Sequence, residues 1–402
     1  MLRQLLLASF TALLLIHPAQ AAPDPADWDG VRQQARGQTV YWHAWGGDQR
    51  INAYIAWAGA EARSRYGVRV EHVKLTATSE AVSRVLAERA AGRHQGGAVD
   101  LIWLNGENFA AMKAADLLFG PWAEDVPNWR YVDVEGKPTV IRDFTIPTDG
   151  LEAPWSMAQV VFYHETARLP DPPRTLRAMA AWIHENPGRF SFPQPPNFLG
   201  TTFLKQALLE LVDDPAPLYV PVDEAYSEIT APLWAFLEDI TPRLWRSGRA
   251  YPRTGPQQRQ MMADGEIDLA ISFSPGEASA AIANFELPDT VRTFVLDGGT
   301  IGNTNFVAIP YNARAKAGAM VLANFLMSPE AQAHKQDPEV WGDLTVLDLD
   351  ALGPEDRIRF DRLSLGVATL PPEALGQVLE EPHPSWMVRI EQDWQARFGT
   401  QR

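Results

Sequence analysis

Strand-like and helix-like segments alternate along the first third of this chain, and this alternation restricts the fold more than any other feature of the sequence. Segments 38–45, 68–75 and 99–104 are rich in aliphatic, β-branched and aromatic residues, as strands are, and a helix-like segment follows each of them. Strands connected through helices in this way usually pair in parallel, with right-handed crossovers. The sequence therefore predicts an α/β fold in which a mostly parallel sheet is flanked by helices.

The length of the chain predicts two lobes of this kind. The chain has 402 residues, and a single hydrophobic core stops growing at about 250 to 300 residues. The strand and helix signals resume after the prolines at 170–173, so the second half is predicted to form a lobe like the first. We expect residues 22–155 and 304–346 to form the first lobe and residues 156–303 and 347–402 to form the second.

The N-terminal residues have the pattern of a secretory signal peptide. Arg3 precedes an apolar stretch at 5–16, and Ala19 and Ala21 provide the small residues of a cleavage site after Ala21. The apolar stretch is too short for a membrane-spanning helix, which needs about 20 residues. We therefore expect residues 1–21 to be removed and the mature protein to be free of a membrane anchor.

The charge balance and the absence of cysteine exclude several classes of function. Lys and Arg number 35 against 50 Asp and Glu, so the net charge of −15 repels nucleic acid and anionic lipid headgroups. With no cysteine, the chain has no disulfide, no thiolate metal site, no thiol nucleophile and no cysteine for a lipid anchor. The predicted partner is a small molecule and not a nucleic acid.

Motifs of the common enzyme classes are absent from the sequence. No GxSxG, P-loop or GxGxxG pattern occurs, and His164-Glu165 does not continue as a zinc-binding HExxH because position 168 is Arg. We therefore predict no catalytic residues, no cofactor and no metal. Because 50 acidic residues allow close carboxylate pairs, a secreted carboxylate-dependent hydrolase of the glycosidase type remains the alternative.

Small and polar residues gather in turns that we expect at the carboxyl ends of strands. Ligands of open α/β sheets bind at that edge, where backbone N–H groups and helix N-termini are available. The alternative is that these residues only close turns and cap helices. The predicted ligand-binding residues are Trp45, Gly46, Gly47 and Asp48; Asn105, Gly106, Glu107 and Asn108; Trp155; Gly200, Thr201 and Thr202; Ser272, Ser274, Gly276 and Glu277; and Asn303 and Asn305.

Three segments carry a family resemblance: 99–106 (VDLIWLNG), 265–271 (GEIDLAI) and 305–310 (NFVAIP). Together with the order of elements, they resemble the extracellular solute-binding proteins of ABC importers, of the type II periplasmic class. The most similar branch is usually labelled as thiamine-type transport. The resemblance implies a monomeric, two-lobed periplasmic protein without enzyme activity, with hinge crossings at 153–164 and near 302–310 and an ABC permease as its partner. Ferric-binding relatives carry adjacent tyrosines, but none of the nine tyrosines here is adjacent to another, which disfavours iron.

The acidic residues at the predicted strand ends favour one class of solute. Asp48, Glu107 and Glu277 would attract a cation, and indole rings such as Trp45 and Trp155 stack on cationic rings. An anion would instead use the glycine and hydroxyl turns with the helix ends, and each acid has an ordinary use in the first turn of a helix. The pattern leads us to expect a cationic or zwitterionic organic solute, such as a thiamine-like compound.

Overall fold

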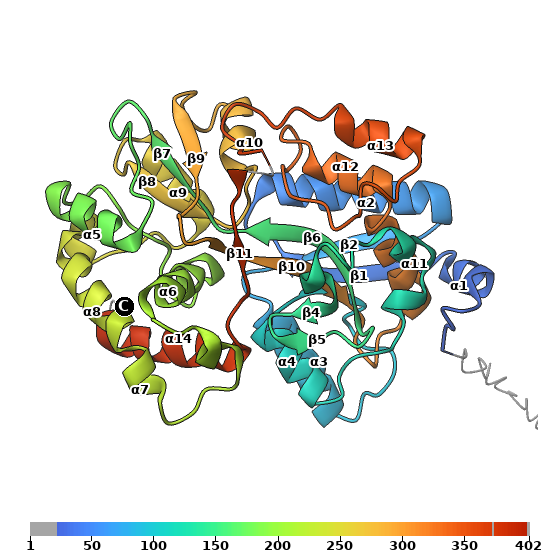
Figure 1. Cartoon of the computed structure of the whole chain (residues 1–402). Helices are drawn as coiled ribbons and strands as arrows, with labels where there is room; N and C mark the ends of the chain where they lie inside the picture. Colours follow the sequence, from blue (N-terminus) through green and yellow to red (C-terminus); the bar gives the residue numbers. More distant parts are fainter. Residues whose placement is uncertain (1–21, 372–373, 400–402) are drawn as a thin grey trace, which may run out of the picture.

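The computed structural model describes residues 22–371 and 374–399 of the chain. The predicted signal peptide, residues 1–21, lies outside the described residues. Two lobes lie side by side, joined by extended strands (Figure 1). The fold is α/β, as predicted.

The first lobe contains the larger sheet, in the order β11-β10-β3-β1-β2, with β6 paired to β10. β1 is parallel to β2 and β3, whereas β10 is antiparallel to β3 and β6. The strands of this sheet are β1 (Thr39–Trp45), β2 (Arg69–Leu75), β3 (Leu101–Leu104), β6 (Glu152–Gln159), β10 (Thr300–Ala308) and β11 (Val378–Leu379). The helices of the lobe are α1 (Trp28–Ala35), α2 (Gln49–Tyr66), α3 (Ser79–Ala90), α4 (Glu107–Ala114), α11 (Lys316–Leu326), α12 (Pro329–Gln336) and α13 (Pro354–Asp361). Shorter elements of this lobe are the hairpin β4 (Arg142–Asp143) and β5 (Ile146–Pro147) and the 3₁₀ helices η1 (Ala123–Asp125), η2 (Pro127–Tyr131) and η3 (Pro138–Ile141).

The second lobe contains a three-stranded sheet in the order β8-β7-β9. Both strand pairs are antiparallel, so the prediction of a mostly parallel sheet is wrong for this lobe. The reason is that β7 directly continues the crossing strand from the first lobe and enters between two strands that run the other way. The elements of this lobe are β7 (Val161–Glu165), β8 (Leu269–Ser272), β9 (Val291–Phe294), α5 (Leu176–Glu185), α6 (Phe198–Leu211), α7 (Tyr226–Ile229), α8 (Ala231–Ile240), α9 (Gly255–Ala263), α10 (Glu277–Ala283), α14 (Pro384–Phe398), η4 (Ala216–Tyr219), η5 (Thr241–Arg243) and η6 (Trp245–Gly248).

Local sequence signals account for several helix boundaries. Asp48 caps the start of α2 by accepting from the backbone N–H of Arg50, and Gly67, at φ 71°, ends that helix in the left-handed conformation that glycine adopts most readily. Ser328 caps the start of α12, because its Oγ accepts from the N–H of Ala331 and Pro329 follows it. Phe190, by contrast, pairs with Leu269 of the second lobe only through an isolated bridge.

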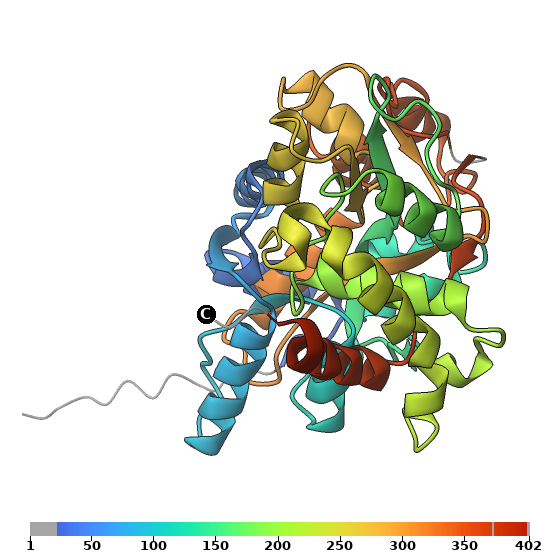
Figure 2. The ribbon, with the colours of Figure 1, turned by 90° about the vertical axis from the view of Figure 1, so that its left-hand side faces the viewer.

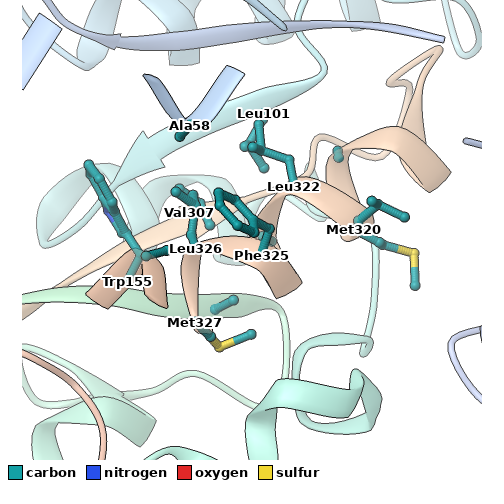
Figure 3. Packing of buried hydrophobic residues seen from close by; sticks show 14 of the residues in the cluster. Ala58, Leu101, Trp155, Val307, Met320, Leu322, Phe325, Leu326 and Met327 are labelled. Atoms are coloured by element: carbon teal, nitrogen blue, oxygen red, sulfur yellow. The ribbon is translucent and has the colours of Figure 1, made fainter. Parts of the chain in front are cut away.

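Each lobe has its own hydrophobic core. Figure 3 shows part of the first core, in which Trp155, Val307 and Phe325 pack together with Leu326 and Leu101. The second core contains rings and aliphatic side chains from α6, α8, β8, β9 and α14. About 25 cal/mol is gained for each Å² of apolar surface removed from water, so each lobe has its own source of stability.

Two strands run from one core to the other. On β6 and its continuation, Trp155 belongs to the first core and Phe162 to the second. On β10 the order is reversed, with Ile301 in the second core and Val307 in the first. The two crossing segments expected at 153–164 and near 302–310 therefore coincide with the strands that link the cores.

The C-terminal residues divide between the lobes, although the predicted boundaries place all of 347–402 in the second. Leu352 and Phe360 pack in the first core, and α13 lies beside α12 (Figure 1). Trp386, Ile390 and Trp394 of α14 pack in the second core, and Figure 2 shows this helix among those of the second lobe. We propose a division in which 347–363 stays with the first lobe and α14 with the second.

Candidate functional site

The two lobes meet along β10, where polar side chains from both lobes gather. Asn303 and Asn305 project from the same face of this strand because side chains two residues apart point the same way. Asn303 Nδ2 donates to Glu381 Oε1 at 3.0 Å, and Asn305 Nδ2 donates to Ser156 Oγ at 2.7 Å. Both predicted residues are therefore buried at the lobe interface and hydrogen-bonded.

An arginine cluster connects the lobes at one end of this interface. It consists of Asp48 and Arg50 from the first lobe and Arg259 and Glu277 from the second. Asp48 Oδ2 lies 3.4 Å from an Nη2 of both arginines, and Arg259 Nη1 lies 2.5 Å from Glu277 Oε1. Ser272 donates a short hydrogen bond to the other oxygen of Glu277. Burial alone would raise the pKa of Asp48, but the two guanidinium charges outweigh it and lower that pKa.

A buried aspartate links both lobes next to this cluster. Asp343 accepts from Ser274 Oγ of the second lobe at 3.4 Å and from Ser156 of β6 through a short bond. Lys335 Nζ lies 3.9 Å from the same carboxylate. Burial raises the pKa of Asp343, opposed by the lysine charge, and burial lowers the pKa of Lys335 to about 8. The serine of the predicted turn thus contacts the opposite lobe.

A lysine cluster occupies the other end of the interface. It consists of Lys205 and Phe198 on α6, Phe144 of the first lobe, and Glu381. The Lys205 ammonium is fully buried, 2.6 Å from Glu381 Oε2, 4.5 Å from the centre of the Phe144 ring and 5.1 Å from that of Phe198. The cation therefore lies near one ring from each lobe, and a carboxylate neutralises it.

Three further carboxyls surround the lysine cluster. Asp143 accepts the N–H of Gly106 at 2.8 Å, Glu391 accepts from Thr201 Oγ1 at 2.6 Å, and Glu107 begins α4, which packs against α14. Burial raises the pKa of Asp143 and Glu107, and burial opposed by the Thr201 hydrogen bond raises the pKa of Glu391 to about 7. The negative charge of Glu107 also raises the pKa of both other carboxyls. Carboxyl groups therefore outnumber the Lys205 ammonium among the described residues at this end.

The tryptophans are placed differently from one another. Trp155 is fully buried, with its ring centre 5.3 Å from Trp42, 5.0 Å from Trp103 and 5.4 Å from Trp341. Figure 3 shows it within the first core, beside Leu326 and Val307. Trp45 is only partly buried, and its ring lies against Gly47. Of the two indoles predicted to bind ligand, only Trp45 has surface left to contact one.

The small residues predicted to bind ligand on the second lobe are packed closely against neighbouring backbone and leave little room for a ligand. Gly200, Thr201 and Thr202 lie in the first turns of α6 and not at the end of a strand, so that expectation is wrong; a loop containing prolines precedes them. A Cβ on Gly200 would lie 1.9 Å from Pro193 O, and one on Gly276 would lie 2.0 Å from Gly342 O of the first lobe. Thr202 donates to the Phe198 carbonyl at 2.8 Å. Gly276 therefore permits contact between the lobes.

The segment after β3 contributes residues to the end of the interface that holds the lysine cluster, called the lysine end below. Gly106 has a φ of 63° and begins α4, and a Cβ there would lie 2.8 Å from the Phe144 ring. Asn108 Nδ2 donates to Glu107 Oε1 at 2.5 Å, and Asn105 is partly buried. Gly46, after β1, is likewise close to a side chain, because a Cβ on it would lie 2.5 Å from that of Lys74.

Sequence reasoning missed the cations and four of the seven acids described above at the interface. Arg50 and Arg259 lie on helices, where arginine usually faces solvent, and Glu381 lies in an irregular segment. Lys205 did carry a signal, because it interrupts the apolar stretch 203–209 (FLKQALL) of a helix buried on nearly all sides. A lysine in such a position is rarely buried unless it is paired.

Two cavities lie away from the lobe interface. One of about 410 Å³ is lined by His164, Arg174 and Arg292 beside β7 and β9, and one of about 270 Å³ is lined by Tyr219, Gly299 and neighbouring residues. Within residues 22–371 and 374–399, no group of three or more histidine or acidic side chains is placed to hold a metal ion. In the same part of the chain, no helix has the length and apolar character needed to cross a membrane.

Comparison with known proteins identifies the family. The sequence profile of the bacterial extracellular solute-binding proteins matches residues 57–347, well over half of the chain. The chain belongs to this family. The Protein YnjB of Escherichia coli (strain K12) is 42% identical over 380 residues, covering 94% of this chain and 96% of that protein.

Solved structures share the fold of this solute-binding protein. The periplasmic binding protein AfuA from Actinobacillus pleuropneumoniae, solved with fructose-6-phosphate, has a TM-score of 0.61 at 13% identity and covers 90% of this chain and 98% of its own. The spermidine/putrescine substrate-binding protein PotD from Streptococcus pneumoniae has a TM-score of 0.59 at 15% identity, with the same coverage. At these identities the likeness extends to the fold, and the solutes in the two names differ in charge: a sugar phosphate in one and polyamines in the other. The family and these neighbours are transport binding proteins and not enzymes.

Proposed function

We propose that this solute-binding protein captures a small cationic or zwitterionic organic solute between its lobes and delivers it unaltered to the transmembrane subunits of an ABC importer. The observation that carries the cargo class is the charge balance at the lysine end of the interface. Four carboxyls, those of Glu107, Asp143, Glu381 and Glu391, gather there, and among the described residues Lys205 is the one ammonium whose charge acts on all four.

A cationic group would relieve an electrostatic cost at this end. Burial raises the pKa of all four carboxyls, because a charged carboxylate is poorly solvated away from water. An added positive charge favours the ionised forms and would lower these pKa values again. The Phe144 and Phe198 rings offer faces that attract a cation, and a thiamine-like solute with its cationic ring is the leading compound to test.

The crossing strands provide the hinge in this proposal. β6 and β10 link the two cores, and a few backbone angles within them can absorb a rotation of one lobe against the other. A solute that contacts both lobes favours the closed form by its difference in affinity for the two forms. Contacts such as Asp48 with Arg259 would then be made or broken as the lobes move.

The cellular setting of the proposal follows from the sequence and the family. Export through the signal peptide, with cleavage after Ala21, would place the mature protein in the periplasm as a monomer. The permease would recognise the closed form.

A ligand panel tests the proposal. Thermal unfolding is measured with thiamine, choline, spermidine and glycine betaine, and with citrate and glucose as anionic and neutral controls. A solute at about 100 times its Kd should add about 2.7 kcal/mol of stability, and mass spectrometry should recover it with unchanged mass. Stabilisation by the anionic or neutral compounds alone would contradict the cargo class. Turnover of a bound compound would contradict the transport role and favour the hydrolase.

A matched pair of variants locates the effect of charge. Glu391→Gln removes one interface charge and keeps a group that can accept from Thr201, whereas Glu380→Gln makes the same change at an exposed position. The cation that gives the largest thermal shift should bind about tenfold more weakly to Glu391→Gln and unchanged to Glu380→Gln. Tenfold corresponds to about 1.4 kcal/mol, a reasonable value for one charge in a partly buried site. Equal losses in both variants would mean that only the net charge of the protein matters.

A further inference from the structure

Arg50 is buried at the lobe interface without enough hydrogen-bond acceptors. Its side chain is 12% exposed, and its Nε and Nη1 are buried with no hydrogen-bond partner among residues 22–371 and 374–399. Within the same residues, its one side-chain hydrogen bond is from Nη2 to Asp48 at 3.4 Å. A guanidinium has five N–H donors and no acceptor, and buried donors are nearly always paired. The arrangement therefore lacks an acceptor beside Arg50.

The acidic neighbours of Arg50 are already engaged elsewhere. Asp48 Oδ1 accepts from backbone N–H groups at the start of α2, and Asp48 Oδ2 is shared with Arg259. Glu277 is bound by Arg259 on one oxygen and by Ser272 on the other. Glu286 pairs with Arg259 Nε at 2.9 Å, and 42% of its side chain is exposed. These carboxylates leave the Nε and Nη1 donors of Arg50 unsatisfied.

The second lobe contributes another donor without an acceptor. The Tyr163 hydroxyl on β7 is buried and has no hydrogen-bond partner in the part of the chain that the structure describes, and the residue is 1% exposed. Tyr163 packs in one cluster with Met262 of α9 and Ala278 of α10, the helices that carry Arg259 and Glu277, and the charges of these two residues and of Arg50 act on it. Burial raises the pKa of this tyrosine, so its hydroxyl keeps its proton and remains a donor at neutral pH. Unsatisfied donors from both lobes thus lie near one another.

We propose that Arg50 and Tyr163 bind an oxyanion of the solute, a carboxylate or a phosphate, when the lobes close around it. This inference rests on the proposed function and narrows it: the solute carries an anionic group in addition to its cation. The anionic group lies at the arginine cluster and the cationic group at the lysine cluster. Arginine suits the first role because its planar fork of donors matches the two oxygens of a carboxylate or phosphate.

The two clusters are connected closely enough for one solute to span them. Phe198, beside Lys205, has its ring centre 5.5 Å from that of Phe273, which lies between Ser272 and Ser274 next to the arginine cluster. Asn303 at the lysine end and Asn305 near the arginine end are two residues apart on β10, which is about 7 Å along a strand.

Titration calorimetry with thiamine and thiamine monophosphate tests the inference, because the pair shares a cationic ring and differs in one phosphate. The wild type should bind the monophosphate at least tenfold more tightly. Arg50→Gln and Tyr163→Phe should each remove most of this advantage while affecting thiamine itself little. Arg63→Gln, an exposed arginine on the same helix α2, should keep the full advantage. Equal affinity for the two compounds in the wild type would overturn the inference and leave the proposed function standing.

A test with inorganic phosphate alone distinguishes the binding of a free anion from the binding of an anionic group that is part of the solute. In the wild type, phosphate at constant ionic strength should raise the Tm only slightly, and Arg50→Gln should remove the effect. If neither thiamine compound binds, the cationic proposal loses its leading ligand, and a phosphate effect that depends on Arg50 and Tyr163 still supports the anion site. Absence of binding by both compounds and of any phosphate effect would overturn it. If Arg50→Gln fails to fold, Tyr163→Phe, which keeps the ring, decides the outcome.

Discussion

The arginine cluster and the lysine cluster lie at the same lobe interface but have opposite deficits. At the lysine end, four carboxyls share one ammonium, and their pKa values are raised by burial. At the arginine end, the Nε and Nη1 of Arg50 and the Tyr163 hydroxyl have no hydrogen-bond partner among the described residues. A solute with a cation at one end and an anion at the other would complete both. The comparison suggests that the unliganded interface is built around a partner that supplies these groups.

The largest effect is expected from the single cation of the lysine end. Lys205→Met leaves Glu381 buried without its partner and should destabilise the protein by about 3 to 5 kcal/mol. The double variant Lys205→Met with Glu381→Gln removes both charges and should recover part of the loss. Urea unfolding of the three proteins measures this, and a single variant as stable as the wild type would mean that the lysine end is not charge-coupled.

A comparison of Trp155 with Trp45 distinguishes a residue of the hydrophobic core from one that can contact the solute. Because its ring is buried among Trp42, Trp103 and Trp341, Trp155→Ala should destabilise the unliganded protein by about 3 to 5 kcal/mol through the cavity it leaves. Trp45→Ala, at a partly buried position, should destabilise it much less and weaken solute binding instead. Denaturation together with calorimetry distinguishes the two roles. A Trp155 variant of normal stability and reduced affinity would move that ring into the binding site.

The raised pKa of Glu391 can be tested through the pH dependence of the protein's stability. Its folded pKa of about 7 lies above its ordinary value of 4.5, so the folded protein holds more protons between these values. The stability contributed by protonated Glu391 is complete below the unfolded pKa and is lost as the pH rises toward 7. Glu391→Gln, which stays neutral, should therefore be more stable than the wild type at pH 8 by up to about 3 kcal/mol and equal to it at pH 4. The control Glu380→Gln should follow the wild type at every pH; a constant difference for Glu391→Gln would contradict the raised pKa.

The smallest effect concerns the link between the lobes near the arginine end. Ser274→Ala removes the 3.4 Å hydrogen bond to Asp343 and should destabilise the contact between the lobes by about 0.5 to 1.5 kcal/mol. Small-angle scattering should then show a larger average radius for the unliganded variant, with the Tm of each lobe nearly unchanged. An identical scattering profile would mean that this bond does not help to hold the lobes together.

The sequence predicted the parts of the fold that depend on local patterns. The strand at 101–104 and the helices after β1 and β3 follow from apolar periodicity and from caps such as Asp48, which act within a few residues. The antiparallel pairing of β7 was not predictable in this way, because it depends on where the crossing strand enters the second sheet. The same limit applies to 347–402, whose helices pack on different cores.

The candidate site was predicted only in part, for a related reason. Asp48 and Glu277 were predicted because turns at strand ends have a recognisable composition, and Asn305 was predicted at the beginning of a strand-like segment. Their partners Arg259 and Ser156 lie far away in the sequence, and nothing local to them indicates the pairing. Trp155 follows Pro154 in a way that is typical of a boundary between lobes, yet packing against three other indoles places it in the core.

The distance between the lobes tests the central claim, that they close on a solute, most directly. Because the chain has no cysteine, Ser64→Cys on α2 and Ala235→Cys on α8 place two spin labels at exposed positions, one on each lobe. Electron paramagnetic resonance should give a broad distance distribution that includes separated lobes without solute. It should give a single narrow, shorter distance with the solute that causes the largest thermal shift. One narrow distance that stays the same with and without that solute would contradict a hinged binding protein.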